Sequence, residues 1–123
     1  MSHISSYNGI KIKDQQLFLK MANRMGSTIE TFRVEKNVRM YGRNEVKATA
    51  SLKVPGWKYP IALDKEGTLH YDHWGSQPGS METLHKIVQE YSRQHIINHI
   101  PVEAQSWFEK KTEKNEIVIE INY

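Results

Sequence analysis

Residues 57–75 read WKYPIALDKEGTLHYDHWG, and this stretch decides the predicted fold because it holds two strand-like segments on either side of a polar turn. From Trp57 to Leu63, large apolar side chains occupy every second position. This period of two is typical of a strand with one buried face. The polar run that follows ends in Gly67, which can adopt a positive φ, so the stretch predicts a β-hairpin.

The return segment of this hairpin, from Leu69 to Trp74, alternates in the same way. If Leu69 and Tyr71 join the core, the opposite face carries His70, Asp72 and Trp74. Side chains two apart on a strand lie on one face. The sequence therefore predicts that an imidazole, a carboxylate and an indole share one surface of the sheet.

The chain before the hairpin also predicts strands. Residues 2–13 alternate, with isoleucines on one face and the other formed by His3, Ser5, Tyr7, Lys11 and Lys13. Two further strand segments are predicted over residues 27–34 and 38–41. Residues 46–54 alternate without a fault, and their apolar row is expected to line the core beneath the helices: Val46, Ala48, Ala50, Leu52 and Val54.

Two segments have the period of amphipathic helices. Asp14 is expected to cap the first, which ends at Gly26. Ser80 is expected to cap the second, which ends before Pro101 because proline disfavours helical geometry at the preceding residue. Residues 105–111 and 116–123 then predict a final hairpin.

The predicted elements follow the order β-α-β-β-β-β-α-β-β. Consecutive strands joined by short turns pair antiparallel, and both helices must cover an apolar stripe. The sequence therefore predicts one α+β domain over residues 1–123, a curved antiparallel sheet with two helices on one face. The helix–four-strand–helix part has the topology of a TATA-box-binding-protein half-unit followed by a C-terminal hairpin, an analogy that carries no function.

Composition excludes several classes of protein. The 17 basic and 14 acidic residues give a net charge of +3, which suits an anionic partner but lacks the dense basic patches of strong nucleic-acid binders. The absence of cysteine excludes disulfides, thiol catalysis and cysteine-based zinc sites. No apolar signal core or membrane-length run is present, so we expect a soluble, cytoplasmic protein with no membrane partner.

Several short motifs resemble one family across nearly the whole chain: MSHIS at the start, IKD before the first helix, then VRMYG, VKA, TLHYDHWG and QEYSRQHI. Together they are similar to the hypothetical chloroplast reading frame thirty-five family, a domain of unknown function in algal plastids, cyanobacteria and some phages. The opening and the segment Asp72 to Gly75 are the most specific, with His73 where the family pattern has tryptophan. The resemblance supports the fold, is compatible with a phage-encoded protein, and implies no catalytic residue.

Alternation places eight candidate ligand-binding residues on the helix-free face: His3, Ser5, Tyr7, Lys47, Lys53, His70, Asp72 and Trp74. Such a mixture of charged, hydroxyl and aromatic groups can hold a small polar or anionic ligand, or a protein. The sequence therefore favours an uncharacterised, non-catalytic binding or adaptor domain without cofactor or metal. The same face also suits a homodimer.

Two alternatives stay open. A nucleic-acid platform would combine Tyr41 and Trp57 with basic residues, namely Arg39, Arg43, Lys47, Lys53 and Lys58. A small hydrolase or metal-dependent enzyme would use His70 and Asp72, with His3 as a further metal ligand. The enzyme alternative is the weaker one, because the sequence has no HExxH run and no glycine-rich phosphate loop.

Overall fold

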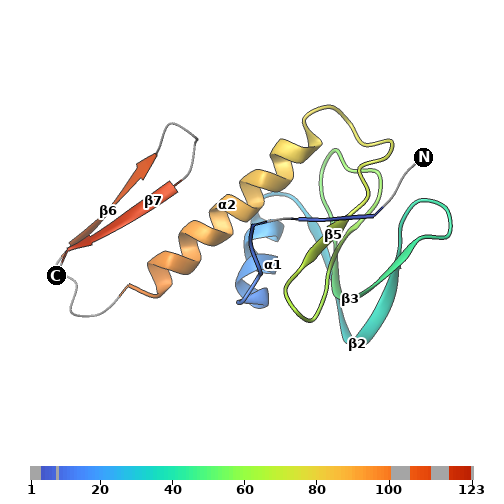
Figure 1. Ribbon diagram of the computed structural model, residues 1–123, viewed down its shortest axis with the longest axis horizontal. Helices are drawn as coiled ribbons and strands as arrows, with labels where there is room; N and C mark the ends of the chain where they lie inside the picture. The colour runs from blue at the N-terminus through green and yellow to red at the C-terminus, as the bar shows by residue number, and fades with distance from the viewer. Residues whose placement is uncertain (1–3, 8, 101–105, 112–116, 123) are drawn as a thin grey trace.

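The computed structural model describes residues 4–7, 9–100, 106–111 and 117–122. Within these residues the elements follow the predicted order (Figure 1): β1 (Ser5–Ser6), α1 (Gln15–Arg24), β2 (Thr28–Arg39), β3 (Glu45–Lys53), β4 (Ile61–Leu63), β5 (Leu69–Tyr71), α2 (Ser80–Asn98), β6 (Ser106–Lys111) and β7 (Ile117–Asn122).

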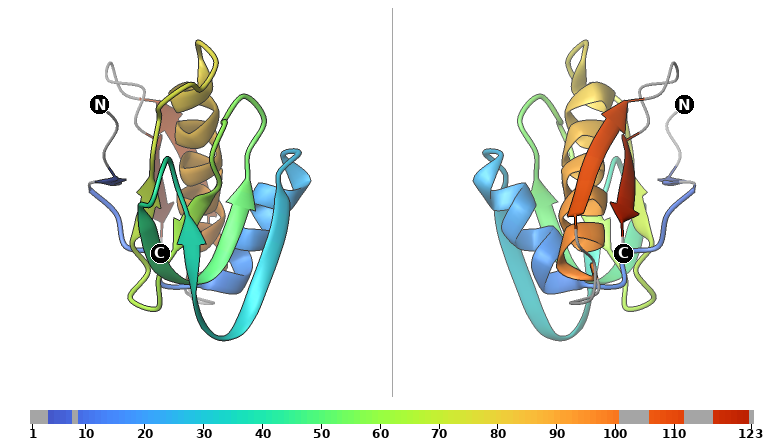
Figure 2. Two further views of the ribbon diagram at one scale, coloured as in Figure 1. Left: turned by 90° about the vertical axis from the view of Figure 1, so that its right-hand side faces the viewer. Right: turned by 90° about the vertical axis from the view of Figure 1, so that its left-hand side faces the viewer.

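Strands β1 to β5 form one antiparallel sheet in the order β1-β5-β4-β3-β2. β2 to β5 each pair with their neighbours in the chain, whereas β1 returns to the edge of the sheet and pairs with β5. Both α1 and α2 pack on one face of this sheet (Figure 2). The α+β architecture predicted from the sequence is confirmed.

The main core lies between the sheet and the two helices. Leu52, Ile61 and Leu63 enter it from the sheet and are fully buried, as are Phe18 of α1 and Leu84 of α2. Burying a side chain of this size stabilises the fold by roughly 1.5–3 kcal/mol. This cluster therefore supplies much of the driving force that holds the helices on the sheet.

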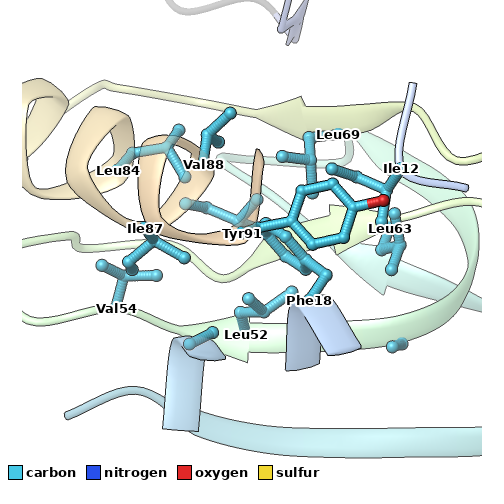
Figure 3. Close-up of a cluster of buried hydrophobic side chains, with 13 residues drawn as sticks. Ile12, Phe18, Leu52, Val54, Leu63, Leu69, Leu84, Ile87, Val88 and Tyr91 are labelled. Atoms are coloured by element: carbon cyan, nitrogen blue, oxygen red, sulfur yellow. The ribbon is translucent and has the colours of Figure 1, made fainter. Parts of the chain in front are cut away.

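Tyr91 of α2 connects the main core to the start of α1. Its ring packs edge-on against Phe18, with the ring centroids 5.6 Å apart (Figure 3). Its hydroxyl oxygen accepts hydrogen bonds from the backbone N–H groups of Lys13 and Asp14, both at 3.1 Å. One side chain thus fixes where α1 begins relative to α2.

A second, smaller cluster lies on the opposite face of the sheet. Its buried members are Val38, Met40, Ala48 and Ala62. Ala62 stands between Ile61 and Leu63, which join the main core, so alternation along β4 turns Ala62 away from the helices. The helix-free face is therefore partly a core of its own rather than a wet sheet surface.

The pairing of β2 with β3 is irregular beside the second cluster. β2 is one strand of 12 residues, not the two predicted segments, and its register against β3 shifts between Thr31 and Lys36. Thr31 pairs with Ala50 and Lys36 with Ala48, so residues 32–35 lie opposite a single residue. Such a bulge bends a strand and increases its twist, and Figure 2 shows β2 curving below the sheet.

The prediction for residues 46–54 is only partly correct. Ala50, Leu52 and Val54 join the main core as expected. Val46 and Ala48 instead join the second cluster, so the prediction that they lie beneath the helices is wrong.

The helix bounds agree with the sequence, but one cap does not. The Asp14 carboxylate accepts from the N–H of Leu17 at 3.1 Å and caps α1, as predicted. The N-cap residue of α2 is Gly79, and it makes no side-chain cap bond. Ser80 is the buried first residue of α2, and its hydroxyl contacts Nε2 of His73 at 2.5 Å.

The strands β6 and β7 form a separate two-stranded antiparallel sheet. α2 lies between this hairpin and the five-stranded sheet (Figures 1 and 2). Arg93 of α2 donates from Nε to the Glu109 carboxylate of β6 at 2.6 Å, which ties the hairpin to the helix. Neither described helix combines the length and the apolar character that a membrane span requires.

Candidate functional site

The pairing of β1 with β5 decides which polar residues reach the helix-free face. Ser6 lies opposite His70, and His70 lies opposite Ala62, so these three positions share that face. Ser5 lies opposite Tyr71, whose side chain packs against the main core on the helix side. The prediction that Ser5 belongs to the helix-free face is therefore wrong.

Tyr7 also lies on the helix side rather than on the predicted face. Its ring packs against the main core, and its hydroxyl contacts Nδ1 of His85 on α2 at 2.5 Å. Burial raises the pKa of the Tyr7 hydroxyl, and the nearby Tyr71 raises it further. The physical reason for the reversed face is that the aromatic ring of Tyr7 finds apolar cover against α2, while Ile4 is covered by the second cluster.

The two lysines of the predicted site lie on opposite faces. Both are exposed. Lys53 follows Leu52, which points toward the helices, so Lys53 lies on the helix-free face. Lys47 precedes Ala48 of the second cluster and therefore points the other way, against the prediction. His3 lies outside the described residues.

Asp72 is 1% exposed and acts as a backbone anchor. One carboxylate oxygen accepts from the N–H of Trp74 at 3.1 Å, and the other accepts from the N–H of Tyr41 at 3.4 Å. Asp72 therefore holds the turn after β2 against the segment after β5. Asp72 and Trp74 were predicted to share one face of the return strand, but both follow the end of β5 at Tyr71, and the Asp72 carboxylate is buried.

Trp74 and Tyr41 form an exposed aromatic pair at this junction. Their side chains are 49% and 41% exposed, and their ring centroids are 5.7 Å apart. Tyr59 adds a third ring, 6.0 Å from Tyr41, and the Lys58 ammonium lies 5.7 Å from the centre of the Tyr59 ring. We call Tyr41, Tyr59, Trp74 and Lys58 the aromatic surface.

A second group of polar side chains lies at the β1 edge of the sheet, and it was not predicted from the sequence. His70 contacts two side chains at once: its Nε2 is 2.8 Å from the Asp64 carboxylate, and its Nδ1 is 3.2 Å from the hydroxyl of Ser6. We call Ser6, His70 and Asp64 the edge triad. The spacing of Asp64 and His70 across the predicted hairpin turn was a usable signal, whereas nothing in the sequence brought Ser6 to them.

Asp64 is held in place by the turn that it begins. Its Oδ1 accepts from the N–H groups of Glu66 and Thr68, both at 2.9 Å. Partial burial raises the pKa of Asp64, but the hydrogen bonds from His70, Thr68 and Glu66 outweigh burial and lower the pKa overall. Asp64 is therefore an ionised acceptor at neutral pH, aimed at His70.

An open pocket of about 530 Å³ adjoins the edge triad. Its lining includes Ser6, Tyr7, Ile10, Lys11 and Thr68. The Lys11 ammonium donates to the Thr68 hydroxyl at 2.5 Å, so a positive charge is fixed at this pocket.

Among the described residues, no group of three or more His, Asp or Glu side chains has an arrangement that could hold a metal ion. His70 and Asp72, the pair considered for metal binding, are occupied by different partners. Comparison of the chain with protein-family models, with curated proteins and with solved structures finds no match. The resemblance to the chloroplast reading frame thirty-five family therefore stays a prediction from the sequence motifs.

Proposed function

We propose that the protein is a binding module that recognises a partner protein through the aromatic surface. The observation that carries this proposal is the exposed pair of Tyr41 and Trp74. Side chains of this kind dominate binding energy where proteins meet, because they bury large area with few rotatable bonds. Leaving two of them side by side in water is unfavourable unless a partner covers them.

The aromatic surface is preorganised for binding. Asp72 fixes the backbone at both Tyr41 and Trp74, so little conformational freedom remains to be lost when a partner docks. The flanking cations favour an acidic partner segment: Lys58 belongs to the surface, and the exposed Arg39 and Arg43 lie two residues on either side of Tyr41.

The experiment is affinity capture from the native host with tagged protein, followed by mass spectrometry and calorimetry with the captured partner. The variant Tyr41→Ala/Trp74→Ala should lose at least about tenfold in affinity, as expected when hot-spot aromatics are truncated. Val34→Ala is the matched control, because Val34 is 77% exposed but lies outside the aromatic surface. A partner held equally by all three proteins would contradict the proposal.

Nucleic acid is the second candidate, since a basic group beside exposed aromatic rings also suits unpaired bases. The structure supplies Tyr41 and Trp74 for such stacking, while the indole N–H of Trp57 is bonded to the Ser80 carbonyl at 2.8 Å and its ring packs on the main core. The salt dependence of binding distinguishes a nucleic-acid partner from a protein partner. Binding to phosphates weakens steeply between 50 mM and 200 mM salt, and burial of aromatic rings does not.

A further inference from the structure

We propose that the edge triad is a nucleophilic site: Ser6 attacks small carboxylic esters bound in the adjoining pocket, His70 accepts its proton, and Asp64 orients His70. This activity is separate from the proposed binding function, because the aromatic surface contributes no residue to it. The proposal rests on the two contacts of His70, on the protonation that they dictate, and on the pocket beside Ser6.

The contacts of His70 determine which ring nitrogen carries the proton. An ionised carboxylate can only accept hydrogen bonds, so Nε2 of His70 must be the donor to Asp64. In the neutral imidazole, Nδ1 is then unprotonated and accepts from the hydroxyl of Ser6. This is the arrangement in which a histidine can remove a proton from serine. The two ring nitrogens exchange the roles that they have in most serine hydrolases, and the chemistry is the same.

The backbone supports this alignment. Ser6 and His70 are directly opposite in the β1–β5 ladder, and the Tyr7 N–H donates to the Leu69 carbonyl at 2.8 Å beside them. The turn bonds of Asp64 hold the carboxylate at the other end. The triad therefore runs from a fixed carboxylate to an exposed hydroxyl, which is the order that nucleophilic catalysis requires.

The pocket indicates the class of substrate. Ile10 and Tyr7 give it an apolar side, and Lys11, which is bonded to Thr68, adds a positive charge to its lining. A cation in the lining of the pocket favours the negative charge that forms on the carbonyl oxygen when serine attacks it. An ester with a short acyl group fits these features.

The reaction balances with water as the second substrate. Ser6 Oγ forms a bond to the acyl carbon while its proton passes to His70 Nδ1, and the alcohol leaves with that proton as its bond to the acyl carbon breaks. Water then attacks the same carbon and gives a proton to Nδ1. The bond from the acyl carbon to Ser6 Oγ breaks, Oγ recovers the proton, and the carboxylic acid is released.

The test uses the full chain and a biotinylated fluorophosphonate, which serine nucleophiles attack with loss of fluoride. Peptide mass spectrometry should find one adduct, on Ser6, and Ser6→Ala should abolish it. Hydrolysis of p-nitrophenyl acetate by the same variants gives a second readout. Ser5→Ala is the matched control, because Ser5 is the adjacent serine but lies on the other face of the sheet.

Asp64 is a positioning residue, and Asp64→Asn tests its role without breaking the turn, since the amide oxygen still accepts from the turn N–H groups. The amide NH₂ would face Nε2 and force the proton onto Nδ1. Labelling should then fall roughly 10²–10⁴-fold, the size of general-base effects. Nitrogen-15 NMR of the imidazole should show the proton on Nε2 in the wild type and on Nδ1 in this variant.

His70→Gln should also abolish labelling, with circular dichroism to confirm folding; if that variant unfolds, the Asp64→Asn comparison decides. Absence of labelling, labelling at another serine, or an equal rate in Asp64→Asn would overturn the proposal. In that case the edge triad serves only to fasten β1 to β5.

Discussion

Gly67 lies in the turn between β4 and β5, against the backbone of Ile12. A β-carbon added at Gly67 would lie 2.9 Å from the amide nitrogen of Ile12 and still closer to the carbonyl oxygen of Ile12, so the two would collide. Gly67 also has φ of +88°, a conformation that side chains disfavour. Gly67→Ala should therefore cost roughly 2–4 kcal/mol in unfolding free energy, measured by urea denaturation.

Gly42→Ala is the comparison that isolates the collision. Gly42 has φ of +66° but nothing within 4 Å of an added β-carbon, so only backbone strain of about 1–2 kcal/mol is expected. Equal losses at the two positions would mean that the segment at Ile12 does not pack on the turn as described.

Asp64 should make the unfolding free energy depend on pH in the acidic range. Because its folded pKa is lowered from 3.8, the ionised form stabilises the fold above that value, and this contribution is lost as the pH falls through the lowered folded pKa. The unfolding free energy of the wild type should therefore drop more between pH 5 and pH 2, a window of about three units around the ordinary value of Asp, than that of Asp64→Asn. Parallel pH profiles would rule out the described hydrogen bonds of Asp64.

At the scale of elements, the start of α2 depends on a contact between side chains rather than on a serine cap. His73 and Ser80 should show a coupling of about 0.5–1.5 kcal/mol in a double-mutant cycle with alanine at each position. Ser92 is the control partner, because its hydroxyl bonds to the Val88 carbonyl within α2, and alanine there should be additive with alanine at His73. Additivity between His73 and Ser80 would mean that their contact does not stabilise the start of α2.

The elements also show why the sequence predicted some features and not others. Asp14 caps α1 through a bond to Leu17, three residues away, so a local pattern was enough. The alternation of residues 46–54 is equally clear, yet Ala48 and Ala50 join different clusters. The register of the neighbouring strand β2 shifts beside these two alanines, and the sequence of β3 gives no sign of that shift.

At the scale of the whole molecule, the order of elements and the fold class followed from the sequence, but the composition of the candidate sites did not. Trp74 was among the predicted site residues, whereas its neighbour Tyr41 comes from the turn after β2, far from Trp74 in the sequence. Ser5 was assigned to the wrong face, since the two residues of β1 have no periodicity of their own and take their orientation from β5. The composition of the aromatic surface and of the edge triad therefore depends on contacts between segments that are distant in the sequence.

The residues that contact β1 lie much later in the sequence, and this affects how the chain folds during synthesis. Ser6 and His70 are 64 residues apart in the chain, and a ribosome that adds roughly 5–20 residues per second needs about 3–13 s to make that length. Tyr7 waits longer, because its partner His85 is 78 residues away. The β2–β3 hairpin has its pairing residues close in the chain and closes early. The first strand to be translated is therefore among the last to be ordered, and a nascent chain keeps Tyr7 and Ile10 uncovered until α2 has been made.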